Sequence, residues 1–190
     1  MRITSQAFNH MLKLNIGYMY SAASLLCAVI GAAYDVRSRR VPNFVTLPAI
    51  CFGLIMHFVL GGWAELGSAA ASGLLCGLIF LVFYLAGGMG AGDVKLITAV
   101  GCIAGLSIIG QLLILTSLAG GAMALGLAIY RRQFRITIFN IYTIALHHKT
   151  QGLTPHPEFN IGNARTLRLP YALAIAAGSA FCFVLKIAQR

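Results

Sequence analysis

Long, uninterrupted apolar blocks are the feature that most limits how this chain can fold. They recur along the 190 residues, and most approach the roughly 20 residues that a helix needs to cross a hydrocarbon core about 30 Å thick. Hydrophobic residues make up 59% of the chain and charged residues only 9%, far from the composition of soluble domains. Continuous blocks favour helices over the alternating strands of a membrane barrel. We therefore predict an all-α polytopic membrane protein.

The breaks between these blocks predict about six transmembrane helices in one membrane-embedded domain, residues 1–190. A short turn is expected over 61–67, and the longest apolar stretch is expected to divide within 101–110. The polar segment 131–169 is predicted as a cytoplasmic loop, in which 136–146 has the character of an interfacial helix. The predicted spans are 16–34, 44–60, 68–86, 94–108, 111–130 and 170–185.

The basic residues predict the orientation of the chain and its partners. The formal net charge is +10, but the basic residues flank apolar blocks and no aromatic and basic surface module accompanies them. We therefore expect contact with membrane lipids and no nucleic-acid partner. With the amino terminus outside, the loops after the first, third and fifth spans hold ten of the fourteen Lys and Arg residues, in line with the positive-inside rule. These ten are Arg37, Arg39, Arg40, Lys95, Arg131, Arg132, Arg135, Lys149, Arg165 and Arg168.

Cysteine and histidine give no pattern typical of a metal site. The five cysteines all fall inside apolar blocks and no two form a CxxC pair, which is typical of small buried hydrophobic residues. His147, His148 and His156 share one loop, but no ligand pattern such as HExxH accompanies them. A solvated loop is the favoured interpretation, and we predict neither a metal nor a cofactor.

The chain has only two aspartates, Asp35 and Asp93, each at a predicted membrane boundary on the same face. The structural interpretation is that Asp35 ends a stop-transfer segment and that Asp93 caps the next helix. The chemical interpretation is that the two meet, because neighbouring carboxylates share a proton. The ionised member then deprotonates water while the protonated member polarises a peptide carbonyl. Since Asp93 would see the positive end of a helix dipole and Asp35 the negative end, we predict Asp93 as base and Asp35 as acid.

Three blocks of sequence resemble the type IV prepilin peptidase family. Gly90-Ala91-Gly92-Asp93, followed by Val94-Lys95-Leu96, looks like its GxGD motif. Asp35-Val36-Arg37 with Val41-Pro42-Asn43 is similar to its first aspartate motif, and Leu169-Pro170-Tyr171-Ala172 with Gly178 resembles a third block. The resemblance implies an aspartic endopeptidase of the bacterial inner membrane that cuts prepilins between a basic leader and the hydrophobic helix of the mature pilin. It also implies that Asp35 and Asp93 are the catalytic pair.

The glycine-rich segment and its neighbours supply further candidates for binding substrate or shaping the loop. They are Gly90, Gly92, Lys95, Pro42 and Asn43. Missing side chains allow an extended peptide to approach, and irregular backbone at membrane depth is tolerated where it lines a cavity. For two of them a plainer role is also open, because Asn43 is well placed to cap the second span and Lys95 to snorkel to the interface.

Two finer expectations and two rival functions complete the predictions. No paired CxxC zinc motifs of the larger family members occur here, so the chain resembles the short type associated with Flp or tight-adherence pili, and amino-methylation of the product is not expected. The rivals are a small transporter that binds a proton or cation on Asp35 and Asp93, and a noncatalytic subunit of a pilus or secretion assembly. The oligomeric state is left open.

Overall fold

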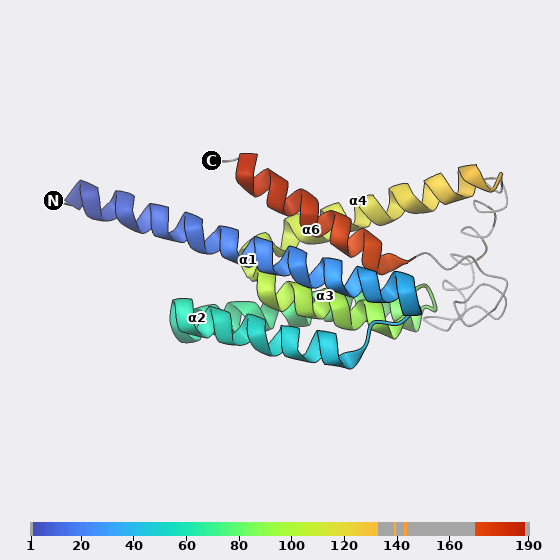
Figure 1. The fold of residues 1–190 in the computed structure, drawn as a ribbon, viewed down its shortest axis with the longest axis horizontal. Helices are drawn as coiled ribbons and strands as arrows, with labels where there is room; N and C mark the ends of the chain where they lie inside the picture. Colours follow the sequence, from blue (N-terminus) through green and yellow to red (C-terminus); the bar gives the residue numbers. More distant parts are fainter. Residues whose placement is uncertain (1, 133–138, 140–142, 144–169, 189–190) are drawn as a thin grey trace.

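Every secondary-structure element of the described chain is a helix, as predicted for an all-α protein (Figure 1). The computed structural model describes residues 2–132, 139, 143 and 170–188, so most of the predicted loop 131–169, with its interfacial helix, lies outside the described residues. The helices are α1 (Arg2–Ser38), α2 (Asn43–Leu85), α3 (Ala91–Ala104), α4 (Leu106–Tyr130) and α6 (Tyr171–Ala188).

Four of these helices are long and apolar enough to cross a membrane: α1 over Asn15–Ser38, and α2, α4 and α6 over their whole lengths. Helix α3 has 14 residues, or about 21 Å at a rise of 1.5 Å per residue, which is less than the hydrocarbon thickness. The chain is thus a multi-pass helical membrane protein, and the count of six spans stays a prediction. Helix α1 also begins at Arg2, well before the predicted start of the first span.

Helix α2 contains two of the predicted spans, because the chain reverses within it at Gly62. Gly62 has φ 71° and ψ −159°, a backbone conformation that favours glycine. The two limbs of α2, 43–61 and 63–85, run in opposite directions (Figure 1). We expected a turn over the whole of 61–67, but Gly62 alone leaves the helical conformation. One glycine with positive φ is therefore sufficient for the reversal.

Helix α3 lies at the centre of the bundle and carries much of its core. Leu96, Ile97 and Val100 are fully buried, and α3 packs closely on both limbs of α2 through small residues. A Cβ at Gly101 would lie 2.9 Å from Cys76 Sγ, and one at Gly53 would lie 2.9 Å from the Ile103 nitrogen. Such contacts bring helix backbones together, as is usual in membrane proteins. Close packing of α3 therefore fixes the position of the side chains in its first turn.

The carboxyl end of α3 is held by a buried histidine on the first limb of α2. His57 is 1% exposed, its Nε2 lies 3.1 Å from the Ile103 carbonyl oxygen, and its ring stacks on Tyr20 of α1 with a centroid separation of 3.8 Å. Its Nδ1 lies 3.5 Å from a Glu65 carboxylate oxygen beyond the reversal. Helix α3 then ends, and Gly105, with φ 75°, separates it from α4. This break falls within the interval 101–110.

Candidate active site

Asp35 is placed by the last turn of α1, at the end of the bundle opposite His57. Helix α1 ends at Ser38, and the Arg39 amide donates a hydrogen bond of 2.7 Å to the Asp35 carbonyl oxygen. Arg39 has φ 53°, and the chain turns there toward the start of α2. The Asp35 side chain is half-buried. A charged residue at the end of an apolar helix is thus held at a wall of the bundle and still has access to solvent.

Asp93 is the third residue of α3 and is buried, with 9% of its surface exposed. The residue that caps α3 is Gly90, and the Gly90 amide donates a hydrogen bond of 3.2 Å to Asp93 Oδ2. The expectation that Asp93 itself is the N-cap is therefore wrong, because its carboxylate instead reaches back to the cap, as the third residue of a capping box does. The other oxygen, Oδ1, is buried and has no hydrogen-bond partner in the described chain.

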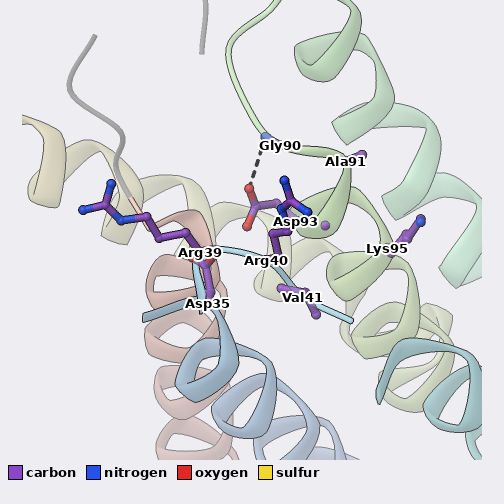
Figure 2. Close-up of a pocket in the computed structure, with 9 residues that line it drawn as sticks. Asp35, Arg39, Arg40, Val41, Gly90, Ala91, Asp93 and Lys95 are labelled. Atoms are coloured by element: carbon purple, nitrogen blue, oxygen red, sulfur yellow. Dashed lines mark hydrogen bonds between the residues drawn. The ribbon is translucent and has the colours of Figure 1, made fainter. Parts of the chain in front are cut away.

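The two aspartates line one pocket of about 320 Å³. Figure 2 shows Asp35 approaching from α1 and Asp93 from the first turn of α3, with the hydrogen bond from Gly90 to Asp93 drawn as a dashed line. The other lining residues belong to the two aspartate motifs or lie between or just after their residues, and they are Arg39, Arg40, Val41, Gly90, Ala91, Gly92 and Lys95. The structure thus brings together the carboxylates that the sequence places 58 positions apart.

Burial and like charge raise the pKa of Asp93. This residue lies outside the four helices that are long enough to span a membrane. Loss of hydration has the largest effect, and the nearby Asp35 charge adds to it, so that the pKa of Asp93 rises to about 6. The amides of Gly90 and Ala172 lower the pKa of Asp93. The Ala172 amide does not form a hydrogen bond with Oδ1, however, which has no partner in the described chain. Proton sharing by such a pair is favoured near neutral pH.

The cations around the pocket do not neutralise the carboxylates directly. Arg39, Arg40 and Lys95 all line it, yet within the described ranges no basic side chain lies within 4.0 Å of a carboxylate oxygen of Asp35 or Asp93. Asp93 keeps a raised pKa because no cation offsets its burial.

The Pro42-Asn43 segment lies against the glycine-rich segment that carries Asp93. A Cβ at Gly92 would lie 3.1 Å from the Val41 nitrogen, so glycine permits the close approach of the two motifs. Lys95 Nζ donates a hydrogen bond of 2.9 Å to Asn43 Oδ1. Helix α2 begins after Pro42 without a side-chain cap, so the expectation that Asn43 caps this helix is wrong. Its amide oxygen instead connects the start of α2 to the first turn of α3.

One part of the site was not among the predicted site residues. The amide of Ala172, near the amino terminus of α6, lies close enough to Asp93 to lower its pKa. This amide belongs to the unsatisfied donors that every helix carries in its first turn. The signal that could have found it is the Leu169-Pro170-Tyr171-Ala172 block, to which no role was given in the site.

Fold and site together define a class: a multi-pass helical membrane protein with a pocket built on two carboxylates at one end of its bundle. Residues 22–125 match the type IV leader peptidase family, and the chain belongs to this family. The matched stretch contains both Asp35 and Asp93.

Curated relatives agree with this assignment. The chain is 34% identical over 124 residues to a prepilin leader peptidase/N-methyltransferase of Aeromonas hydrophila, which corresponds to 60% of this chain and 42% of that protein. A protein of the same name from Burkholderia pseudomallei is 34% identical over 124 residues, 60% of this chain and 39% of that protein. The chain thus matches about two fifths of the length of these relatives. No solved structure matches the chain.

Proposed function

We propose that this protein is an aspartic endopeptidase that removes the leader of a type IV prepilin at the cytoplasmic boundary of the bacterial inner membrane. The observation that carries the proposal is the pocket shared by Asp35 and Asp93. Membership of the type IV leader peptidase family supports it, as do relatives named prepilin leader peptidase/N-methyltransferase. The proposal covers peptide hydrolysis, and the expectation that the chain does not methylate its product stays a prediction.

In the proposed mechanism Asp93 begins as the acid and Asp35 as the base. This assignment is the reverse of our prediction from helix dipoles, because burial of Asp93 and the charge of Asp35 outweigh the amides of Gly90 and Ala172. Asp35 takes a proton from water as the water oxygen attacks the scissile carbonyl carbon. Asp93 gives its proton to the carbonyl oxygen, and a neutral tetrahedral diol forms.

Collapse of the diol restores the starting state of the pair. The carbon–nitrogen bond breaks as Asp35 returns its proton to the leaving amine. Asp93 recovers a proton from one hydroxyl group, and that oxygen becomes part of the carboxylic acid product. No covalent enzyme intermediate is formed, and each carboxyl group ends the cycle as it began. The two carboxyl groups titrate as a unit. The roles of acid and base therefore belong to the pair, and each residue changes role during the cycle.

The surroundings of the pocket suit a peptide held at a membrane boundary. Gly90, Ala91 and Gly92 form one wall, where short side chains leave room for an extended backbone. The half-buried Asp35 is open to water, which the reaction consumes. Prepilins of the Flp type are the proposed substrates, on the resemblance to the short peptidases of that group, and membrane lipids are the expected surroundings.

The test is to change each aspartate separately to asparagine and to follow the size of a coexpressed prepilin. General acid–base groups contribute about 10²- to 10⁴-fold to rate, so Asp35→Asn and Asp93→Asn should each reduce processing by at least about 100-fold. Glu65→Gln is the matched control, because Glu65 lies half-exposed beside His57 at the opposite end of α3. Processing that survives both aspartate changes would contradict the proposal and favour a transporter or an assembly subunit.

A further inference from the structure

A second hollow, distinct from the pocket of the two aspartates, lies between α2, α4 and α6. Its volume is about 590 Å³ and its lining contains no charged residue. We call it the apolar groove, and its walls include Ile79, Phe83, Met89, Leu118, Gly121 and Tyr171. We propose that the apolar groove binds the hydrophobic helical segment of the peptide substrate that follows the scissile bond into the membrane. This inference rests on the proposed function.

The first argument is that the apolar groove meets the catalytic pocket at two places. Gly88 and Met89 line the groove, and the next residue, Gly90, lines the pocket. Tyr171 also lines the groove, and the amide of the next residue, Ala172, lies beside Asp93. For a bound peptide whose scissile bond lies between the carboxylates, the groove is therefore the nearest apolar surface.

The second argument concerns the direction and the chemistry of the groove. On α4 it extends from Leu113 to Ala124, a distance of about 17 Å along the helix axis. Helix α4 is one of the four helices long and apolar enough to cross a membrane, so we expect the groove to run across the membrane and not along its surface. Each apolar side chain that leaves water or lipid for a closely fitting protein wall contributes favourable packing. A charged residue in the bound segment would be strongly unfavourable there.

The third argument distinguishes a helix from a lipid chain as occupant. Gly120, Gly121 and Ala124 present small residues on the groove side of α4. A Cβ at Gly120 would only touch Ala174 of α6, at 3.5 Å, whereas a Cβ at Gly121 would meet nothing within 4 Å. Small residues are not needed against a flexible acyl chain, but they permit the close approach of a second helix. Gly121 therefore marks a surface shaped for an incoming helix.

The experiment fills the groove at Gly121 and uses Gly126 of the same helix as its matched control. Both glycines are exposed and have open space where a Cβ would be placed, but Gly126 is not part of the groove lining. Cleavage is measured on a full-length prepilin in proteoliposomes and on a short peptide that spans the cleavage site without the apolar segment. Gly121→Leu should raise KM for the full-length substrate about tenfold, leave kcat within about twofold, and leave cleavage of the short peptide unchanged. Gly126→Leu should change neither.

Two outcomes overturn the proposal without involving the catalytic assignment. Equal effects of Gly121→Leu and Gly126→Leu on the full-length substrate would show that the groove does not bind the substrate. An equal loss on both substrates would place the effect on folding or catalysis. Asp93→Asn is assayed in parallel, and cleavage that persists in this variant refutes the proposed function itself.

A photo-crosslinking amino acid at position 121 gives a readout that does not depend on cleavage. It is introduced into Asp93→Asn, which should hold the prepilin uncleaved, and the adduct is identified by its mass. An adduct with the apolar segment of the prepilin is expected. An adduct with lipid alone, or with a second copy of this chain, would overturn the proposal.

Discussion

The two ends of α3 differ in the contacts made by the buried polar side chain at each end. At the carboxyl end His57 is stacked on Tyr20 and its Nε2 is within hydrogen-bond distance of the Ile103 carbonyl oxygen. Its Nδ1 has no hydrogen-bond partner in the described chain but lies 3.5 Å from a Glu65 carboxylate oxygen. At the amino end Asp93 is also buried, with 9% of its surface exposed against 1% for His57. One of its carboxylate oxygens has no partner in the described chain, and no cation there lies within salt-bridge distance of it.

This difference separates a structural site from a reactive one. A buried ring that is stacked, hydrogen-bonded and close to an opposite charge adds order to the fold, whereas a buried carboxylate next to a like charge and without a nearby cation is unfavourable to stability. Natural proteins retain such strain mainly where activity requires it. The His57 end is therefore expected to support stability with little effect on chemistry, and the Asp93 end is expected to support chemistry while it lowers stability.

The largest predicted effect on stability is at the carboxyl end of α3. His57→Ala removes a ring that is 1% exposed and stacked on Tyr20, and it leaves the Ile103 carbonyl oxygen without its side-chain partner. Truncation of a large buried side chain typically costs about 2 to 5 kcal/mol, so we expect a loss of about 3 kcal/mol in the free energy of unfolding. Thermal unfolding in detergent measures it.

Phe52→Ala is the control for the histidine substitution, because Phe52 lies on the same limb of α2 but is 53% exposed. It should change stability by less than about 1 kcal/mol. Activity per folded molecule should be close to that of the unmodified protein in both variants. A His57→Ala protein that is as stable as the control, or that is fully folded but inactive, would remove the distinction between the two ends.

The next effect is smaller and has the opposite sign, because Asp93→Asn is predicted to stabilise the protein near neutral pH. Folding raises the pKa of Asp93 from 3.8 to about 6, so between these values the native state binds more protons than the unfolded state. Stability then falls as the pH rises through this interval. At pH 7.5 the variant, which cannot ionise there, should be more stable by on the order of 1 to 3 kcal/mol, and at pH 4 the difference should vanish.

Unfolding of the two proteins at pH 4 and pH 7.5 checks this prediction. An Asp93→Asn protein that is less stable than the unmodified protein at pH 7.5 would show that the ionised carboxylate supports the fold. The amino end of α3 would then resemble the carboxyl end.

Much of the architecture follows from the pattern of apolar blocks, but the packing does not. The hydropathy of the chain predicts a membrane protein made of helices, and the glycine content of 101–110 predicts a break there, which the structure has at Gly105. Helix α4 is apolar around its whole circumference. For this reason its sequence does not reveal which side meets α6 and which side forms the apolar groove.

The candidate site was predictable in its acids and less so in its supporting contacts. Asp35 and Asp93 stood out because a chain so poor in acidic residues carries them at two membrane boundaries. The contact of Lys95 with Asn43 depends on how α2 and α3 lie beside each other. So does the position of the Ala172 amide, which comes from α6. Local propensity holds no information on such distant pairs, and it assigned Asn43 to a cap that the structure does not use.

The smallest predicted effect concerns this contact between Lys95 and Asn43, which we expect to act as a positioning device for the pair of carboxylates. A hydrogen bond of this kind contributes about 0.5 to 1.5 kcal/mol. Lys95→Met and Asn43→Leu should therefore each lower kcat about three- to tenfold, because Asp93 is then held less firmly relative to Asp35. KM should change by less than about twofold, since neither side chain is proposed to touch the substrate.

The double variant and a conservative one separate positioning from substrate binding. If the two residues act through one hydrogen bond, Lys95→Met combined with Asn43→Leu should be no slower than either single variant, because the contact is lost only once. Asn43→Asp keeps an acceptor oxygen at 2.9 Å from Lys95 Nζ and should keep kcat near that of the unmodified protein. Additive losses, or losses confined to KM, would instead assign these side chains to the substrate, and the first turn of α3 would then depend on its backbone and on Gly92 alone for its position.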